Sequence, residues 1–507
     1  MAFVQNVPFF SIILSMFAGI VSSILPAKAA RRLNIGVTIL IGAMSAWLLA
    51  FMIQSDMGYY TYMMGHFPAP WGNEIRAGVL EALMALVFCI VMVLSLMGGL
   101  HKFREVEPEV EASKENLYYI LVDLLLGSLL ALVYTNDIFT AYVFVEINTL
   151  AACGLIAIRQ IGRTFEAAVR YMIMSLLGSG LLLMGICMLY DMTGHLLMSN
   201  MKESIALIME EGTYAVPMLI TIGLIVVGLA IKSALFPFHA WLPDAYGYST
   251  VSSAAMLSSL VSKGYIFLLV KIFYRVIGFE YIADSQVLNI IFWFAICGMI
   301  FGSMNAIWEK DIRRMIAFSS VAQIGYIYMG FGLGTEAGMI ASVFHMLMHS
   351  ATKSLLFISA IGLTDASGFK RDFFEVTGAG YRNKIAGAGF LVGSLSMVGI
   401  PMFAGFVSKL LFAQAAVGED SWRMFPAIIV LAISTILNAV YFMKTVLRIY
   451  TPMPAEEEAK KGYVPISWKE NKVYSVAIVA FIILNIVLGC NSKPIIMLIE
   501  EGLRNFM

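Results

Sequence analysis

Charged side chains are scarce in this sequence, and its few cysteines lack a metal-binding spacing. Charged residues make up 13% of the chain and hydrophobic residues 60%. The five cysteines mostly stand singly inside apolar runs, without a CxxC or Cys/His pattern, so we interpret them as small core residues. A glycine-rich phosphate loop is absent as well. These absences predict neither a metal site nor a cofactor, and they argue against redox chemistry in this chain.

An excess of charge of one sign is also missing. The chain has 33 Lys and Arg residues against 33 Asp and Glu residues, so no polybasic face for nucleic acid is expected. We find no cleavable signal, because the first apolar run, residues 8–25, is long enough to remain as a helix. The remaining class is a polytopic membrane protein without room for a separate soluble domain.

Long apolar runs fill nearly the whole sequence. Each run is near the ~20 residues that cross a bilayer as a helix, so we predict an all-α membrane protein with about fourteen transmembrane helices. A polar loop through Pro68 and Pro70 and a charged linker at 101–116 separate the early spans. The predicted spans are 8–25, 33–53, 77–98, 117–134, 138–158, 167–190, 216–236, 250–272, 287–307, 315–333, 337–363, 386–417, 425–450 and 473–490.

Basic residues favour one set of connecting loops. The loops after odd-numbered spans hold most of them: Arg31, Arg32, Lys102, Arg104, Arg159, Arg163, Arg313, Arg314, Lys370, Arg371, Lys460 and Lys461. The positive-inside rule puts these loops in the cytoplasm, and both termini on the extracytoplasmic side of the cytoplasmic membrane of a prokaryote. Lys271 and Arg275 are exceptions, because they fall on the opposite side.

Two of the predicted spans are interrupted close to a lysine. The span that carries Lys232 runs into Pro237, and a later span breaks at 399–401, shortly before Lys409. Proline has no backbone N–H for a helical ladder, and broken backbone at membrane depth requires burial or water. Paired broken spans in the two halves of a chain point to an inverted-repeat transporter. We therefore expect an ion path near both breaks.

Isolated charges occur inside several spans. A bare charge at the bilayer centre costs about 3 kcal/mol on insertion scales, so such charges indicate a functional path. Glu146 lies in mid-span, and Lys232 is its candidate partner. Lys263 is too central in its span to reach the interface easily. The simpler alternatives are a lysine that snorkels to the interface, for Lys232 and Lys409, and a hydrogen bond to nearby hydroxyl or backbone groups, for Glu146.

A row of ionisable groups is predicted on one helix face. His345, His349 and Lys353 are spaced i, i+4 and i+8, which places them on one stripe of a helix. Imidazoles with a pKa near neutrality are suited to pass protons between fixed charges. The alternative is that each histidine is a hydrogen-bonded core residue.

Other polar residues have competing explanations. Asp137 stands where an N-cap of the Glu146 helix is expected. His239 and Asp244 border the first break, where they could serve the path or only satisfy freed backbone groups. Asp123 lies early in its span and could lie at the membrane interface.

Six segments, in chain order, are typical of one family. They read VFVEINTLAA, IKSALFPFHAWLPDA with VSSAAML, LVSKGY, DIRRMIAFSSVAQIGY, HMLMHSATKSLLF and GIPMFAGFVSKLLF. By these segments the chain resembles the antiporter-like subunits, which comprise the proton-pumping subunits of respiratory complex I, the D subunits of Mrp-type sodium/proton antiporters and their counterparts in membrane-bound hydrogenases. The match runs from about residue 117 to residue 417; Tyr248 and Thr250 stand near the places where the family usually has prolines.

The resemblance implies a fold of fourteen helices with two inverted five-helix repeats and broken helices 7 and 12. It divides the chain into the first three helices at 1–116, repeats at 117–275 and 276–451, and a final loop and helix at 452–507. It assigns the proton relay to Glu146, Lys232, Lys263, Lys353 and Lys409, with supporting roles for His345, His349, His239 and Asp137.

The implied function is translocation of protons, or of sodium and protons, within a larger complex of integral membrane subunits. In length and lysine pattern the chain is most similar to the Mrp D subunits or their hydrogenase counterparts. A proton-pumping subunit of a complex I-like NADH–quinone oxidoreductase is the alternative, and a stand-alone secondary carrier is a more distant one. The sequence leaves open the ion, the host complex and the direction of pumping.

Overall fold

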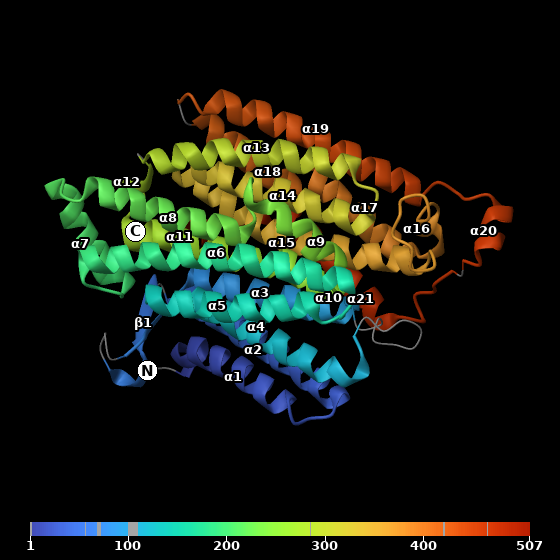
Figure 1. The fold of residues 1–507 in the computed structure, drawn as a ribbon, viewed down its shortest axis with the longest axis horizontal. Coiled ribbons are helices and arrows are strands. Elements are labelled where there is room, and N and C mark those ends of the chain that lie inside the picture. The colour runs from blue at the N-terminus through green and yellow to red at the C-terminus, as the bar shows by residue number, and fades with distance from the viewer. Residues whose placement is uncertain are drawn as a thin grey trace.

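Long helices that run side by side in nearly the same or opposite directions form most of the molecule (Figure 1). The computed structural model describes residues 3–55, 57–67, 72–99, 110–283, 285–418, 421–463 and 465–507. Pro68, Pro70, Lys102, Arg104 and most of the linker 101–116 lie outside the described residues. Within the described ranges, 13 helices are long and apolar enough to cross a membrane, and two shorter apolar helices form one more, broken span. The all-α membrane fold predicted from the sequence is confirmed.

The helices follow the predicted spans closely. The first half contains α1 (Val7–Ser22), α2 (Ala27–Ser55), α3 (Val79–Gly99), α4 (Glu115–Tyr134), α5 (Ile138–Ala157), α6 (Gly162–Thr193), α8 (Ala215–Ser233), α9 (Leu242–Tyr248), α10 (Val251–Met256) and α11 (Ser262–Ile272). The second half contains α13 (Gln286–Trp308), α14 (Ile312–Gly332), α15 (Glu336–Asp365), α17 (Lys384–Val398), α18 (Ala404–Gly418), α19 (Met424–Ile449) and α21 (Lys472–Cys490).

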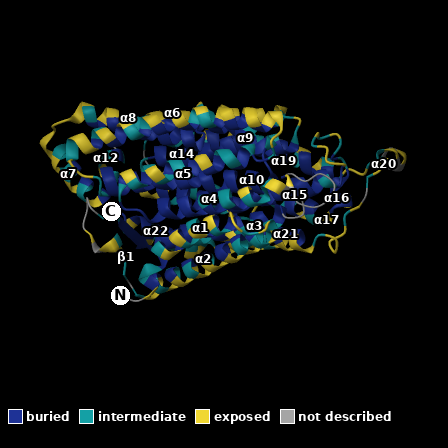
Figure 2. Ribbon diagram, turned by 60° about the horizontal axis from the view of Figure 1, so that its bottom comes forward, coloured by how far each residue is buried: buried dark blue, intermediate teal, exposed yellow. Residues whose placement is uncertain are grey.

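Burial divides these helices into central and peripheral ones. α10, α11 and α15 are buried along nearly their whole length, and α14 is nearly so, whereas α1, α2, α6 and α19 keep one exposed apolar face (Figure 2). The central helices carry many serines, threonines and ionisable groups, and the peripheral ones present leucine, isoleucine and phenylalanine outward. Polar groups are thus gathered in the interior, shielded from lipid, as expected where they are functional.

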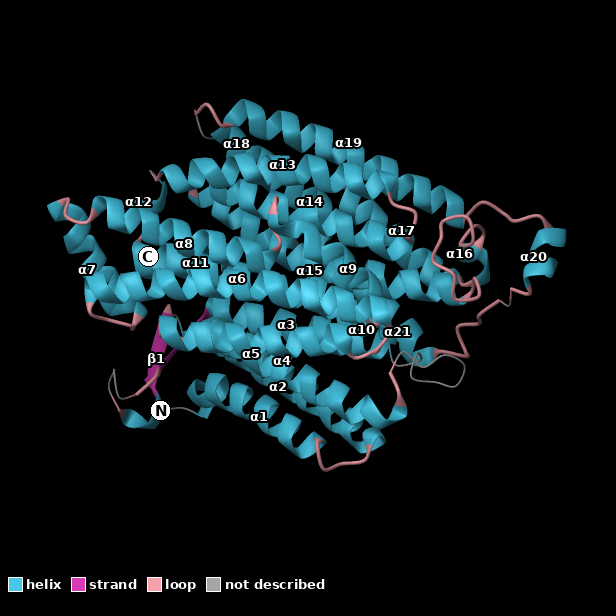
Figure 3. Ribbon diagram, viewed as in Figure 1, coloured by secondary structure: helices cyan, strands magenta, loops and turns pink. Residues whose placement is uncertain are grey.

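Several small elements were not predicted from the sequence. A β-hairpin of β1 (Tyr59–Met63) and β2 (Glu74–Gly78) joins α2 to α3, and Figure 3 shows it in magenta. At the same end of the molecule lie α7 (Met198–Glu211) and the amphipathic α22 (Ser492–Arg504), as Figure 2 shows. The remaining short helices are α12 (Phe279–Ala283), α16 (Ala379–Arg382) and α20 (Ala455–Lys461).

Lys271 and Arg275, the exceptions to the loop-charge pattern, are buried. The helix continues beyond α11 as a π-helical turn, Phe273–Ile277, so both residues face inward instead of lying in a loop. Lys271 donates to the carbonyl groups of residues 132, 133 and 135 at the end of α4. The guanidinium of Arg275 lies 3.8 Å from the carboxylate of Glu81 on α3. Lys271 therefore caps the end of α4, and Arg275 links its helix to α3. Because neither lies in a loop, these two residues carry no information about the orientation of the chain in the membrane.

Asp123, whose place early in its span was compatible with the membrane interface, is buried between helices. Its carboxylate accepts a hydrogen bond of 2.6 Å from the Asn34 amide on α2 and one of 3.4 Å from the Ser22 hydroxyl. Asp123 lies two turns inside α4, facing α1 and α2, and this position places its side chain between helices rather than at the helix end.

Candidate functional site

The first broken helix places a lysine at its own C-terminal end. α8 ends at Ser233, and Ala234 takes a left-handed conformation with φ of 63°. Lys232 lies in the last turn, where carbonyl groups lack helical partners and the helix dipole favours a cation. Beyond the break the chain passes through the short 3-10 helix 238–241 into α9. Lys232 is fully buried, so it does not snorkel to the interface.

Glu146 on α5 is the partner of this lysine. Its Oε1 lies 3.4 Å from Nζ of Lys232, and the Ser179 hydroxyl on α6 donates to the same oxygen. Lys232 also donates to the Thr149 hydroxyl at 2.8 Å, one turn further along α5. The lysine side chain is 0% exposed and the glutamate side chain 26% exposed. The predicted contact is present, and the carboxylate is its more accessible member.

Lys263 follows a local change in helix geometry. α10 passes into a π-helical turn, Leu257–Val261, directly before α11. Such a turn shifts the backbone hydrogen-bond ladder by one residue and occurs often at functional sites. Nζ of Lys263 donates to the Ser258 carbonyl at 2.7 Å inside this turn. Among the residues that the structure describes, no carboxylate pairs with Lys263, so a backbone carbonyl is its acceptor.

The predicted row on α15 is present, and all three of its side chains are buried. The ring centroids of His345 and His349 are 6.1 Å apart. Nδ1 of His345 lies 2.6 Å from the Ser408 hydroxyl on α18. Neither ring nitrogen of His349 has a hydrogen-bond partner among the described residues. The charges of Lys353 and of Lys263 on α11 act on both histidines. The row on α15 and Lys263 therefore form one electrostatic cluster.

Lys353 is held by the neighbouring helix α14. Its Nζ donates to the Ile316 carbonyl at 3.0 Å and to the Ser319 hydroxyl. The ring centroid of Phe442 on α19 lies 5.9 Å from the same nitrogen. Because α15 is unbroken around Lys353, the acceptors of this lysine come from another helix and not from a local interruption.

The second broken helix supplies a carbonyl to its lysine. α17 ends at Val398, and Gly399 has a φ of 92° that favours glycine. Nζ of Lys409 on α18 reaches back across the break and donates to the Val398 carbonyl at 2.7 Å. The same nitrogen lies 5.8 Å from the ring centroid of Tyr326, which stacks on His345 at 5.5 Å. Lys409 therefore adjoins the end of the row that carries His345.

Asp137 lies apart from this line of charges. Its carboxylate accepts a hydrogen bond of 2.6 Å from the Thr140 N–H, so it is the N-cap of α5. Asp137 precedes Glu146 by nine residues, which is about 13 Å along an α-helix. The capping alternative is thus confirmed by the geometry.

His239 and Asp244 border the break, and within the described ranges no hydrogen bond or ion pair joins either of them to Lys232, Lys263, Lys353 or Lys409. His239 stacks on Phe236 with ring centroids 5.4 Å apart. Asp244 pairs with Arg170 on α6 at 2.7 Å and with Arg314 on α14. Asp244 therefore fastens α9 to two other helices, which is a structural function.

The hydrogen-bond partners of the buried lysines, of Glu146 and of His345 were missed by the sequence analysis. The lysines contact Thr149, Ser258, Ile316, Ser319 and Val398, whereas Ser179 donates to Glu146 and Ser408 contacts His345. Serine and threonine are numerous in the spans, so their number gave no reason to select these positions. A rule that places small hydroxyl residues one turn from an intramembrane charge would have found Thr149, three residues after Glu146.

A metal centre is not indicated by the described side chains, where no group of three or more His, Cys, Asp or Glu residues converges. The line from Glu146 to Lys409 instead offers ammonium groups, one carboxylate, two imidazoles and several hydroxyls. These groups can accept and release protons, and they lie on helices from both halves of the chain.

Comparisons with known proteins agree with the geometry. The family described as "NADH:quinone oxidoreductase/Mrp antiporter, TM" matches residues 135–436, a range that contains Glu146 and all four lysines of the line. NADH-quinone oxidoreductase subunit N of Desulforudis audaxviator is 32% identical over 391 residues, covering 77% of this chain and 75% of that protein. The D subunit of the Na(+)/H(+) antiporter of Bacillus subtilis is 25% identical over 414 residues, covering 80% of each. A chain of the Mrp complex from Dietzia sp. DQ12-45-1b has the same fold, with a TM-score of 0.86 at 22% identity, over 100% of this chain and 98% of that one.

Proposed function

The chain belongs to the family of transmembrane subunits of NADH:quinone oxidoreductases and Mrp antiporters, and we propose that it translocates protons through its line of buried charges. It is an antiporter-like, multi-pass membrane subunit of a larger complex. Sodium exchanged against protons is the alternative cargo, and the name of the B. subtilis relative supports it. The interior of this chain supports the proton, since its lysines, histidines and hydroxyls all exchange protons.

The observation that carries this proposal is the contact between Glu146 and Lys232. At 3.4 Å and an effective dielectric of 20, the pair is worth about 5 kcal/mol, less some screening because Glu146 is partly exposed. If the pair opens, the buried ammonium loses its carboxylate, and burial then favours the neutral amine. Opening and closing of this contact would therefore release and recover a proton.

The released proton has a line of further acceptors. Lys232 and Thr149 adjoin Tyr265 of α11, whose ring centroid lies 5.4 Å from the lysine Nζ. Lys263 precedes Tyr265 by two residues and acts electrostatically on the α15 row. We place Lys353 and the two histidines next, and Lys409 last, on the extracytoplasmic side. His349, with both ring nitrogens unpaired in the described structure, is suited to exchange protons with water.

The host, the membrane and the internal symmetry belong to the same proposal. We assign the chain to an Mrp-type antiporter or a membrane-bound hydrogenase, and keep a complex I-like oxidoreductase as the alternative that the D. audaxviator relative supports. The partners are other integral subunits in the cytoplasmic membrane, and both termini face away from the cytoplasm. The repeats are 117–275 and 276–451. The first repeat contains the break after α8, and the second contains the corresponding break after α17. Residues 1–116 and 452–507 flank the two repeats.

The test is to neutralise the pair in the intact complex. We expect Glu146→Gln and Lys232→Ala to abolish proton translocation in proteoliposomes, measured with a pH-sensitive dye, because each removes one partner of the switch. Co-purification of the other subunits on size exclusion shows whether the complex has assembled.

Two exposed charges provide matched controls. Glu210 lies in the last turn of α7 and Lys384 begins α17, and both are exposed. Glu210→Gln and Lys384→Ala repeat the same chemical changes away from the line, and should pump as the wild type does. Normal pumping by either pair variant in an assembled complex would disprove the proposed switch.

A further inference from the structure

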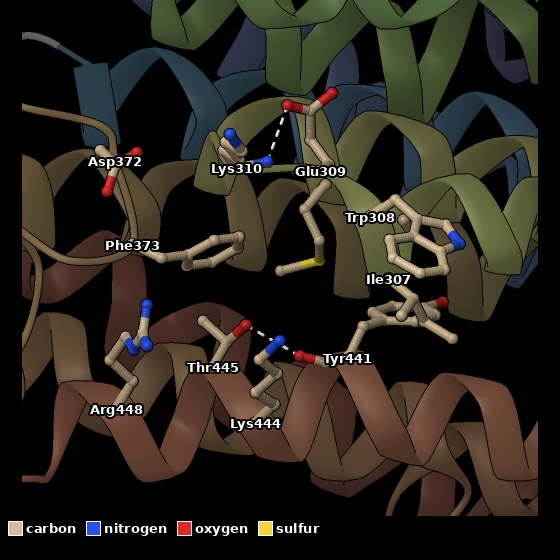
Figure 4. Close-up of a pocket in the computed structure, with 12 residues that line it drawn as sticks. Ile307, Trp308, Glu309, Lys310, Asp372, Phe373, Tyr441, Lys444, Thr445 and Arg448 are labelled. Atoms are coloured by element: carbon tan, nitrogen blue, oxygen red, sulfur yellow. Dashed lines mark hydrogen bonds between the residues drawn. The ribbon is translucent and has the colours of Figure 1, made fainter.

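A cavity lies at one end of the bundle, outside the line of charges. It has a volume of about 310 Å³ and opens where α13 ends, α14 begins and α19 ends (Figure 4). Its buried lining is formed by Ala306, Met315, Tyr441 and Thr445. The ends of three membrane spans meet here, so the mouth lies at the level of the membrane–water interface. Trp308, which lines the mouth, is 79% exposed, as is typical of interfacial aromatic residues.

Three cationic side chains line this cavity without a partner. Lys444 and Arg448 lie one turn apart on α19, and Lys310 stands on the opposite wall (Figure 4). In the described part of the chain, the side chains of these three residues make no ion pair or hydrogen bond. Cations at a cavity wall without protein partners require an anion or water as their counterpart.

The two acidic residues of the lining are already engaged. Glu309 forms an ion pair of 3.0 Å with Arg314, and its other oxygen accepts the backbone N–H of Lys310 at 2.8 Å. Asp372 is exposed and accepts the backbone N–H of Phe374 at 2.8 Å. Arg314 offsets the charge of Glu309, so the cavity keeps a net positive charge.

The positive lining argues against a role as an access path for protons. Three unpaired cations repel hydronium and attract anions. The outer faces of α13 and α19 beside the cavity are apolar and exposed, with Phe301, Ile436 and Val440 directed outward. An occupant that is anionic at one end and apolar at the other satisfies both features.

We propose that this cavity binds the phosphate headgroup of an anionic phospholipid. The planar guanidinium of Arg448 suits two phosphate oxygens at once, while Lys310 and Lys444 add point charges on either side. The acyl chains lie along the exposed faces of α13 and α19. Basic pockets between transmembrane helices are a recognised type of lipid headgroup site. This inference does not depend on the proton relay.

The test compares lipids bound to the purified complex in nanodiscs. We expect phosphatidylglycerol to be retained through washing with phosphatidylcholine vesicles, as measured by native mass spectrometry, and to give headgroup density at Arg448 in a cryo-EM map. Each removed cation should weaken retention about fivefold, and removal of all three on the order of 100-fold. Inorganic phosphate at tens of millimolar should leave the retained lipid in place.

The variants are Lys310→Gln, Lys444→Gln and Arg448→Gln, singly and together, with Lys469→Gln as the matched exposed control. Loss of phosphatidylglycerol in the triple variant, with full retention in Lys469→Gln, supports the proposal. The single variants provide the same measurement if the triple variant fails to assemble. Equal retention by the triple variant, displacement by inorganic phosphate, or an acidic segment of a neighbouring subunit in the cavity would each overturn it.

Discussion

The two broken helices hold their lysines in different ways although both present a cation to a helix C-terminus. Lys232 belongs to the last turn of α8 and is paired with the carboxylate of Glu146 at 3.4 Å. Lys409 stands beyond the second break and reaches back to the Val398 carbonyl of α17 at 2.7 Å. In the described structure no carboxylate pairs with Lys409.

This difference teaches that the break, and not the carboxylate, is the common element. A broken helix leaves carbonyl groups whose negative dipole end can hold a cation. The carboxylate adds a second, removable partner in the first half only. Under the proposed function, the first site changes state when this pair opens, and the second accepts a proton while it keeps its contact with the Val398 carbonyl.

The largest effect is expected at Lys409. We predict that Lys409→Ala stops translocation and also lowers stability, because a buried carbonyl without its donor costs about 1–3 kcal/mol. Lys409→Glu should keep some transport, since glutamate also carries a proton. Proteoliposome pumping and thermal unfolding of the complex measure the two effects. A Lys409→Ala complex that is intact and pumps normally would leave the last position of the relay without an assignment.

Arginine substitutions at the two central lysines, Lys263 and Lys353, distinguish the need for a positive charge from the need for proton exchange. Arginine keeps its charge at any accessible pH, so Lys263→Arg and Lys353→Arg should block transport, by roughly 100-fold, while the positive charge remains. The measurement is dye-monitored pumping together with subunit co-purification. If both arginine variants retain full coupled transport, these residues are structural cations and the relay runs elsewhere.

A smaller effect is predicted at the contact between the row and the second break. Ser408→Ala removes the hydroxyl that lies 2.6 Å from Nδ1 of His345, and we expect a several-fold loss of pumping. Ser394→Ala is the matched control, because the buried Ser394 hydroxyl has no hydrogen-bond partner among the described residues. Equal rates for the two variants would show that Ser408 does not position the histidine.

The smallest effect is expected at Glu375, in a loop outside the spans. Hydrogen bonds from Tyr463 and Lys461 lower the pKa of Glu375 to about 2. Its stabilising contribution is complete above the ordinary pKa of 4.5 and is lost as the pH falls through about 2. Glu375→Gln should therefore lower the unfolding temperature slightly at pH 7 and less at pH 3, without changing transport. A Glu375→Gln complex that pumps slowly would contradict this.

Much of the fold could be predicted, because apolar runs of bilayer length leave few alternatives to transmembrane helices. The cap at Asp137, the pairing of Glu146 with Lys232 and the break shortly before Lys409 also followed from local rules. The π-helical turn before Lys263 could not be predicted, since its residues have an ordinary helical pattern. The inward turn of Lys271 and the burial of Asp123 depend on contacts with helices more than eighty residues away.

α15 runs unbroken between the two interrupted helices, and this limits which parts of the interior can change conformation. A thirty-residue helix packed on every side has no hinge, because it lacks proline, a π-turn or an inserted side chain to bend it. His345, His349 and Lys353 share this continuous helix, so we predict that their mutual spacing stays constant during transport. Spin labels placed along α15 should then report one constant distance, while labels placed across either break should report a change of distance.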